Sequence, residues 1–301
     1  MEKIFVSLVC DLVVQNHQHC RWISAASGLV KKGENIFVIA DDRQELALFN
    51  LSAPGLAELI TFDSTPLSEA KAERKAQKND WESLLTIVID GQETLLAVPS
   101  GSTDLRNTAV IADLSIVDGS VNVSKVRKIS CKGLFEELKK RIEDLNIEGA
   151  TICGKKFLLF QRGNGIAGVN AVIAFNADEF AAELRKGELS ANLKFDIHHI
   201  NLGHLNGCRL GFTDAFCDVE GELWYLAAAE RADSTYLDGE FSGAVVGRLA
   251  SDYSVTAQKE LAILHKPEGL AVEIQNGRRK FFIVTDSDDE SSPAKLYSFY
   301  F

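Results

Sequence analysis

Short apolar runs separated by turn-forming residues recur along this chain. The stretch from Asn146 to Asn176 shows the pattern most clearly: a polar and a small residue lead into an apolar run, a glycine turn follows, and two further apolar runs come after it. Apolar runs of this length bounded by Gly and Asn predict short β-strands. The same order fits residues 27–50 and 268–299, and more loosely residues 82–114 and 214–249. The chain therefore contains about five copies of one unit of strands.

This repeat predicts an all-β fold, a five-bladed β-propeller, because a single small sheet cannot bury both faces unless neighbours pack on each side. A leading polar residue opens each copy, and the intervals between these residues are 55, 66, 66 and 54. The leading residues are Ser27, Glu82, Glu148, Asp214 and Glu268. We expect one domain over residues 1–301, and a six-bladed propeller is the alternative.

The last copy ends after three strands, whereas residues 3–10 form an apolar strand that precedes the first copy. Propellers avoid an exposed sheet edge when one terminus completes the blade begun by the other. We therefore expect residues 3–10 to supply the fourth strand of the last blade. The polar stretch over residues 68–80 is expected to be a solvated helix or loop. Helices are expected over residues 134–145, with an apolar face, and from Asn176, as N-cap, to Gly187.

Charge and cysteine content narrow the function classes. The chain has 43 acidic and 32 basic residues and a net charge of −11, so we expect neither nucleic acid nor anionic membranes as partners. No apolar segment approaches the roughly 18 residues needed to span a bilayer. The six cysteines lie far apart, which favours free thiols in a reducing cytoplasm. We expect a cytoplasmic monomer.

The first strand of each propeller blade lines the central channel, so the five leading residues should form a ring around the axis. Converging carboxylates repel one another unless they are protonated, hydrated or neutralised by a cation. Calcium accepts six to eight oxygen ligands and would suit this set. The alternative is that these side chains bond backbone amides of the next blade.

The segment from Ser27 to Asp42 resembles the first blade of the calcium-activated nucleotidases (apyrases), and the EGLAV segment at Glu268 resembles their last repeat. This resemblance implies a five-bladed propeller with one axial calcium held by Ser, Glu, Glu, Ser and Glu; only Asp214 departs. The paired arginines of that family are represented here only by Arg162. The SGL, SGS, QRGN, TDA and EGL motifs are also similar to a bacterial propeller family of no known activity, distantly similar to phytase-like and SdiA-regulated domains.

Two function classes follow. Arg106, Arg162 and Arg231 lie near the predicted strand ends and could bind a phosphate or carboxylate of a substrate. Together with a metal they predict a calcium-dependent hydrolase of a small phosphorylated or lactone-like substrate. The alternative is a non-catalytic binding scaffold with a structural axial cation. The histidines of the 198–204 segment are expected at an outer strand, in surface or packing roles.

Overall fold

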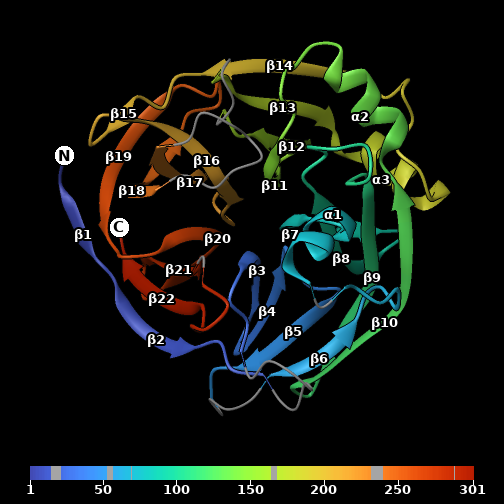
Figure 1. Ribbon diagram of the computed structural model, residues 1–301, viewed down its shortest axis with the longest axis horizontal. Coiled ribbons are helices and arrows are strands. Elements are labelled where there is room, and N and C mark those ends of the chain that lie inside the picture. Colours follow the sequence, from blue (N-terminus) through green and yellow to red (C-terminus); the bar gives the residue numbers. More distant parts are fainter. Residues whose placement is uncertain (15–21, 53–56, 69, 164–167, 232–239, 288) are drawn as a thin grey trace.

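The computed structural model describes residues 1–301 except 15–21, 53–56, 69, 164–167, 232–239 and 288. Its strands form five sheets arranged around a central axis (Figure 1). Blade one contains β3 (Ala26–Lys32), β4 (Asn35–Ala40), β5 (Glu45–Asn50) and β6 (Glu58–Thr61). Blade two contains β7 (Trp81–Ile89), β8 (Gln92–Pro99), β9 (Thr108–Val117) and β10 (Ser120–Ser130). The five-bladed prediction is confirmed.

The other three blades follow the same order from the axis outward. Blade three contains β11 (Ile147–Cys153), β12 (Lys156–Gln161), β13 (Asn170–Asn176) and β14 (Phe195–Ile200). Blade four contains β16 (Cys208–Cys217), β17 (Leu223–Arg231), β18 (Glu240–Leu249) and β19 (Val255–Ala262), with the short β15 (His204–Leu205) paired to β16. Blade five contains β20 (Lys266–Gln275), β21 (Arg278–Asp286) and β22 (Lys295–Tyr300).

The N-terminal segment closes the propeller. β2 (Ser7–Asp11) runs antiparallel to β22 and completes blade five, as the sequence predicted. β1 (Lys3–Phe5) lies parallel to β19, so it adds an outer strand to blade four, which the sequence did not predict. The first eleven residues thus cross the seam between two blades on the rim of the molecule (Figure 1) and cover the outer strand of each.

Three helices lie outside the sheets in the described part of the chain. α1 (Lys71–Gln77) falls within the stretch expected to be a helix or a loop. α3 (Ala177–Lys186) begins at the predicted cap, where the Asn176 side chain accepts hydrogen bonds from the backbone of Asp178 and Glu179. α2 (Lys132–Lys139) ends at Lys139, whereas the spacing of apolar residues predicted a helix that continues to residue 145. The last two apolar positions, Ile142 and Leu145, are nevertheless buried.

Apolar side chains from both faces of each sheet fill the space between neighbouring blades. Between blades two and three, Phe157 stacks on Phe180 of α3 with ring centroids 3.7 Å apart. Trp81 is fully buried between blades one and two, and its indole N–H donates to the carbonyl of Thr108. Each blade is therefore stabilised by its neighbours, and the inner strands β3, β7, β11, β16 and β20 contact one another in a closed cycle.

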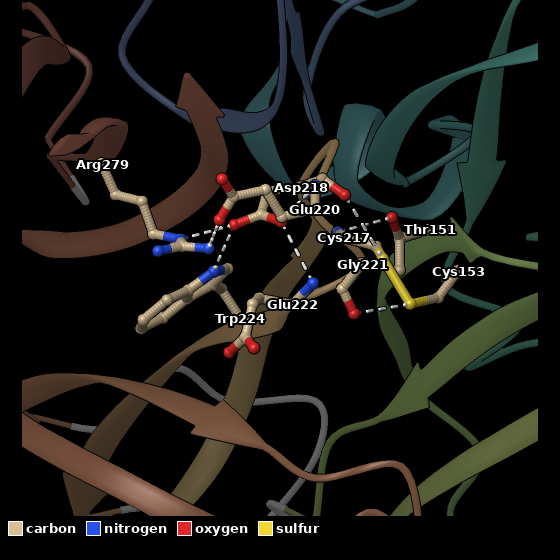
Figure 2. Close-up of a disulfide and its surroundings, with 9 residues drawn as sticks. All are labelled: Thr151, Cys153, Cys217, Asp218, Glu220, Gly221, Glu222, Trp224 and Arg279. Atoms are coloured by element: carbon tan, nitrogen blue, oxygen red, sulfur yellow. Dashed lines mark hydrogen bonds and ion pairs between the residues drawn. A yellow bond between two sulfur atoms is a disulfide. The ribbon is translucent and has the colours of Figure 1, made fainter. Parts of the chain in front are cut away.

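The cysteine prediction is wrong for one pair. Cys153 of β11 and Cys217 of β16 form a disulfide that joins blades three and four (Figure 2), whereas Cys10, Cys131 and Cys208 are free. The two bonded cysteines lie 64 residues apart, and the packing of the two blades brings them together. None of the helices in the described ranges is long and apolar enough to cross a membrane.

Candidate metal centre

Every inner strand carries one β-bulge at the start of the sequence repeat. In β3, the pairing with β4 passes from Ala26 directly to Gly28, so Ser27 has no partner in the ladder. The same interruption leaves out Glu82, Glu148, Thr213 and Glu268 in β7, β11, β16 and β20. A bulge takes one residue out of the ladder and re-aims its side chain. These five residues, which we call the ring residues, occupy equivalent positions around the axis.

The fourth ring position is therefore Thr213, and the expectation of Asp214 there is corrected. In blades one, three and five the residue after the ring position faces the backbone of the next blade. An added Cβ at Gly28, Gly149 or Gly269 would lie about 3 Å from that backbone. Asp214 occupies this second position in blade four. Its carboxylate accepts a hydrogen bond from the backbone N–H of Leu270 in blade five, at 2.7 Å. Asp214 thus links two blades.

Ser27 also links neighbouring blades. Its hydroxyl donates to the carbonyl of Trp81 in blade two, at 2.6 Å, and the side chain is buried. The hydroxyl oxygen keeps its lone pairs, so this bond leaves it able to accept a further donor or to bind a cation.

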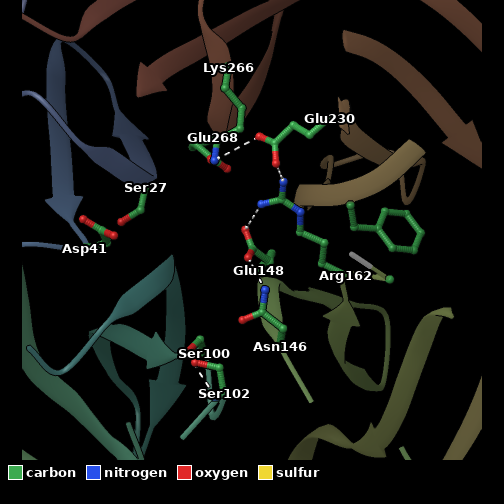
Figure 3. Close-up of polar contacts among 12 residues, drawn as sticks. Ser27, Asp41, Ser100, Ser102, Asn146, Glu148, Arg162, Glu230, Lys266 and Glu268 are labelled. Atoms are coloured by element: carbon green, nitrogen blue, oxygen red, sulfur yellow. Dashed lines mark hydrogen bonds and ion pairs between the residues drawn. The ribbon is translucent and has the colours of Figure 1, made fainter. Parts of the chain in front are cut away.

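Ion pairs connect the ring residues Glu148 and Glu268 to basic and acidic side chains of blades three, four and five (Figure 3). Arg162 donates to Glu148, at 3.2 Å, and to Glu230, at 2.6 Å. Lys266 contacts Glu230 at 3.2 Å and Glu268 at 2.8 Å. All five side chains are 4–6% exposed. We call these five residues the first half-cluster.

A second group of the same composition lies on blades one and two. Lys78 contacts Asp41 and Asp80, and Arg106 donates to Asp80 at 2.7 Å. In the described part of the chain, one acidic trio brings a carboxylate oxygen of each member within 4.8 Å of the others, and it comprises Asp41, Asp80 and the ring residue Glu82. These five residues are the second half-cluster. Lys78 already neutralises part of the trio, which makes it a poor metal site by itself.

Together the two half-clusters contain six carboxylates and four basic groups. They act on one another: burial raises the pKa of Glu82 well above its ordinary range, and Asp80 and Glu148 raise it further. Burial likewise raises the pKa of Glu148, against the effect of Arg162, and raises that of Glu268 well above its ordinary range, against the effect of Lys266. The two half-clusters carry a net charge of −2 when all six of their carboxyls are ionised and their four basic groups are protonated.

Two ring oxygens have no hydrogen-bond partner although they are buried. They are Oγ1 of Thr213, which is fully buried, and Oε2 of Glu268, whose other oxygen contacts Lys266. A buried polar atom without a partner costs about 1–3 kcal/mol, so such atoms need an explanation. The two residues occupy equivalent positions on the inner strands of adjacent blades. A cation with oxygen ligands would satisfy both atoms and add positive charge. Among the described residues, the ring carboxylates of Glu82, Glu148 and Glu268 do not form a trio with oxygens within 4.8 Å of one another, so a calcium ion that binds all three requires these side chains to approach one another.

The loop after β4 carries a further concentration of unpartnered polar atoms. Asp42 Oδ1, Arg43 Nε and Gln44 Oε1 are all buried without a hydrogen bond. Burial raises the pKa of the Asp42 carboxyl to about 6, and the neighbouring charge of Asp41 raises it further. Buried groups with perturbed pKa values are typical of functional sites. Asp42 adjoins Asp41 of the second half-cluster and titrates close to neutral pH.

The three arginines predicted to bind a substrate anion do not lie together in one open site. Arg106 and Arg162 are buried in the two half-clusters, where each contacts a carboxylate. The side chain of Arg231 lies outside the described residues. His198 and His199 lie on β14, the outer strand of blade three, as expected, and the His198 ring packs against Tyr253.

Sequence reasoning missed Lys78, Asp80 and Lys266. A signal for two of them was present, because Asp80 and Lys266 each stand two residues before a ring glutamate. Asn146 has the same offset from Glu148 and donates to its carboxylate at 2.6 Å. A polar residue two positions before the ring is therefore part of the repeat in three blades.

Comparison with solved structures finds chains whose backbones partly superpose on this one at low sequence identity. Glutaminyl cyclase from Myxococcus xanthus is 11% identical, with a TM-score of 0.46 over 100% of this chain and 99% of that one. An α-L-arabinanase from Cellvibrio cellulosa is 11% identical, with a TM-score of 0.46 over 93% and 92%. A gluconolactonase from Xanthomonas campestris is 14% identical, with a TM-score of 0.44 over 91% and 72%.

No curated protein sequence matches this chain. A family model matches residues 22–300, which is nearly the whole propeller. The chain therefore belongs to the family of unknown function DUF6929.

Proposed function

We propose that this propeller binds a calcium ion on its axis through the ring residues Ser27, Glu82, Glu148, Thr213 and Glu268. The observation that carries the proposal is the pair of buried, unpartnered oxygens, Thr213 Oγ1 and Glu268 Oε2, at equivalent positions of adjacent blades. Hydroxyl and carboxylate oxygens are ligands that calcium prefers. The resemblance of the Ser27–Asp42 and Glu268 segments to calcium-activated nucleotidases supports the same ion.

Charge favours a divalent cation over a monovalent one. The half-clusters contain six carboxylates and four basic groups, so two positive charges restore neutrality. Protonation of two carboxyls would do the same, and the raised pKa values of Glu82 and Glu268 support a competition between protons and the proposed cation. We therefore expect calcium affinity to fall as the pH is lowered.

The proposed activity is hydrolysis of a small phosphorylated or lactone-like substrate. Calcium, when bound, would polarise an oxygen of the substrate or of water. Asp42 is the proposed acid–base group, because a pKa of about 6 lets its carboxyl accept and release a proton near neutral pH. Arg231 follows Glu230 on β17 and stays the predicted contact for an anionic group of the substrate.

A non-catalytic scaffold with a structural cation is the second candidate, and one observation favours it. Arg106 and Arg162 already contact buried carboxylates, so they stabilise the half-clusters themselves. Under this alternative the cation joins the inner strands, and no substrate reaches it.

Calorimetric titration of chelator-treated protein with calcium, followed by hydrolysis assays, separates these proposals. The substrates are p-nitrophenyl phosphate, a nucleoside triphosphate and an aryl lactone. We expect calcium binding that Glu268→Gln removes, and turnover that Asp42→Asn removes while calcium still binds. Binding without turnover favours the scaffold. A protein that neither binds calcium nor turns over any of the three substrates refutes the proposal.

A further inference from the structure

A cavity between blades three and four lies apart from the axial ring. Its volume is about 630 Å³, within the range of small-molecule sites, roughly 300–1,000 Å³. On one side its walls come from the end of β11, the β11–β12 turn and β12. On the other side they come from the β16–β17 turn, β17, β18, the turn that follows β18, and β19. No ring residue and no member of either half-cluster lines it.

The lining combines an apolar floor with basic groups. Leu158, Leu223 and Leu249 are buried apolar residues of the lining, and the largely buried Tyr253 adds an aromatic ring that also contacts His198 and Lys156. Lys155, Lys156 and Arg248 also line the cavity, against the single carboxylate of Glu222. In a chain with a net charge of −11, this excess of positive charge is local. It would attract an anion to an otherwise acidic protein.

The basic groups are available to a ligand to different degrees. Lys156 contacts the Tyr253 hydroxyl, at 3.1 Å. Arg248 pairs with Glu222 at 2.8 Å, but both side chains are about two-fifths exposed, so the pair contributes little. The exposed Lys155 ammonium has no ion pair with any described residue. Lys155 can therefore bind an anion without breaking an existing contact.

One wall of the cavity is held rigidly (Figure 2). The Asp218 carboxylate accepts hydrogen bonds from the backbone of Glu220 and Glu222, from the Trp224 indole, and from Arg279 at 2.7 Å. The Cys153–Cys217 disulfide joins blades three and four beside the β16–β17 turn, which contains Glu220 and Glu222. Cys153 itself lines the cavity. A wall fixed before binding lowers the entropy cost of binding a ligand.

We propose that this cavity binds a small organic anion with a flat apolar body, such as an aryl carboxylate, sulfonate or phosphate ester. Tyr253 and the leucine floor would contact the body, and Lys155 with Arg248 would contact the anionic group. This site and the axial metal centre are independent of each other, so either proposal can fail alone.

Fluorescence titration with anilinonaphthalene sulfonate, compared with neutral phenylnaphthylamine, tests the site. Lys155→Glu should weaken binding of the sulfonate by about tenfold, because a charge-assisted contact is lost. Glu222→Gln should strengthen it, because the single carboxylate of the lining is removed. Lys132→Glu on α2 carries the same charge change at an exposed, remote position and should leave the affinity unchanged.

Both probes should bind the wild-type protein, and only the sulfonate should respond to Lys155 and Glu222. Equal effects of Lys155→Glu and Lys132→Glu would overturn the proposal, since binding would then follow net charge alone. So would absence of sulfonate binding, or binding that Glu222→Gln weakens. Circular dichroism of each variant confirms that the fold is retained.

Discussion

Replacing Asp42 by Asn should stabilise the protein near neutral pH. Burial raises the pKa of the Asp42 carboxyl from 3.8 to about 6, and its Oδ1 has no hydrogen-bond partner. A group with a raised pKa in the folded state contributes stability that is fully present below pH 3.8 and is lost as the pH rises through about 6. A difference of this size corresponds to roughly 3 kcal/mol of folding free energy at neutral pH. Asn keeps the shape and removes the charge.

The measurement is urea or thermal unfolding of the wild type and Asp42→Asn across this pH range, with chelator present so that metal binding does not contribute. The variant should gain roughly 1–3 kcal/mol near neutral pH, allowing for the burial of an amide in place of the carboxylate. The wild type should lose stability as the pH rises from 3.8 to about 6, and Asp42→Asn should not show this loss. An unchanged pH dependence in Asp42→Asn would refute the reasoning.

Asp63 provides a control of opposite sign. Burial alone would raise the pKa of Asp63, but hydrogen bonds from Lys128, Thr65 and Asn79 outweigh it and lower the pKa to about 2. The stability that Asp63 contributes is therefore present above pH 3.8 and is lost as the pH falls through about 2. Asp63→Asn should destabilise the protein near neutral pH. Stabilisation by both variants would indicate a general effect of reduced negative charge.

Two further substitutions test the ion pairs and the links between blades. Lys266→Met leaves Glu230 and Glu268 buried without that cation, and should cost about 3–5 kcal/mol of unfolding free energy by chemical denaturation. Lys295→Met removes a more exposed pair and should cost below about 1 kcal/mol, so equal losses would argue against the buried network. Asp214→Ala should cost about 1–3 kcal/mol by the same assay because the cross-blade hydrogen bond is lost. Asp214→Asn keeps an acceptor and should cost less, and the reverse order would contradict the linking role.

Most of the fold could be predicted from the sequence repeat, because each blade consists of consecutive strands whose apolar runs and turns are local in the sequence. Apolar runs and turn residues mark the strands, and the chain has room for five units, so the blades and the closure by β2 could be predicted. The pairing of β1 with β19 could not be, since the choice between two outer edges depends on their separation in space. The Cys153–Cys217 bond could not be predicted for the same reason. β11 and β16 are far apart in the sequence, and the packing of blades three and four brings their sulfurs together.

The site was predictable only in part. Four ring positions coincide with the bulges, but Thr213 and Asp214 are both polar, and the sequence alone does not show which residue the ladder leaves out. Lys78 and Lys266 are ordinary lysines in the sequence. Their role arises from carboxylates that the fold places beside them, including Asp41 and Glu230 from other parts of the chain. Ion pairs between neighbouring blades, such as Arg162–Glu230 and Lys266–Glu230, depend on how the blades pack against one another.

Thermal unfolding of chelator-treated protein with and without added calcium tests the axial metal centre most directly. A ligand that binds only the folded state stabilises it by about 2.7 kcal/mol at one hundred times its dissociation constant. We expect calcium to raise the midpoint of the wild type and of Glu136→Gln, which alters an exposed glutamate of α2, and to leave that of Glu268→Gln unchanged. A wild-type midpoint that calcium does not move, or an equal rise in Glu268→Gln, would contradict the proposed ring.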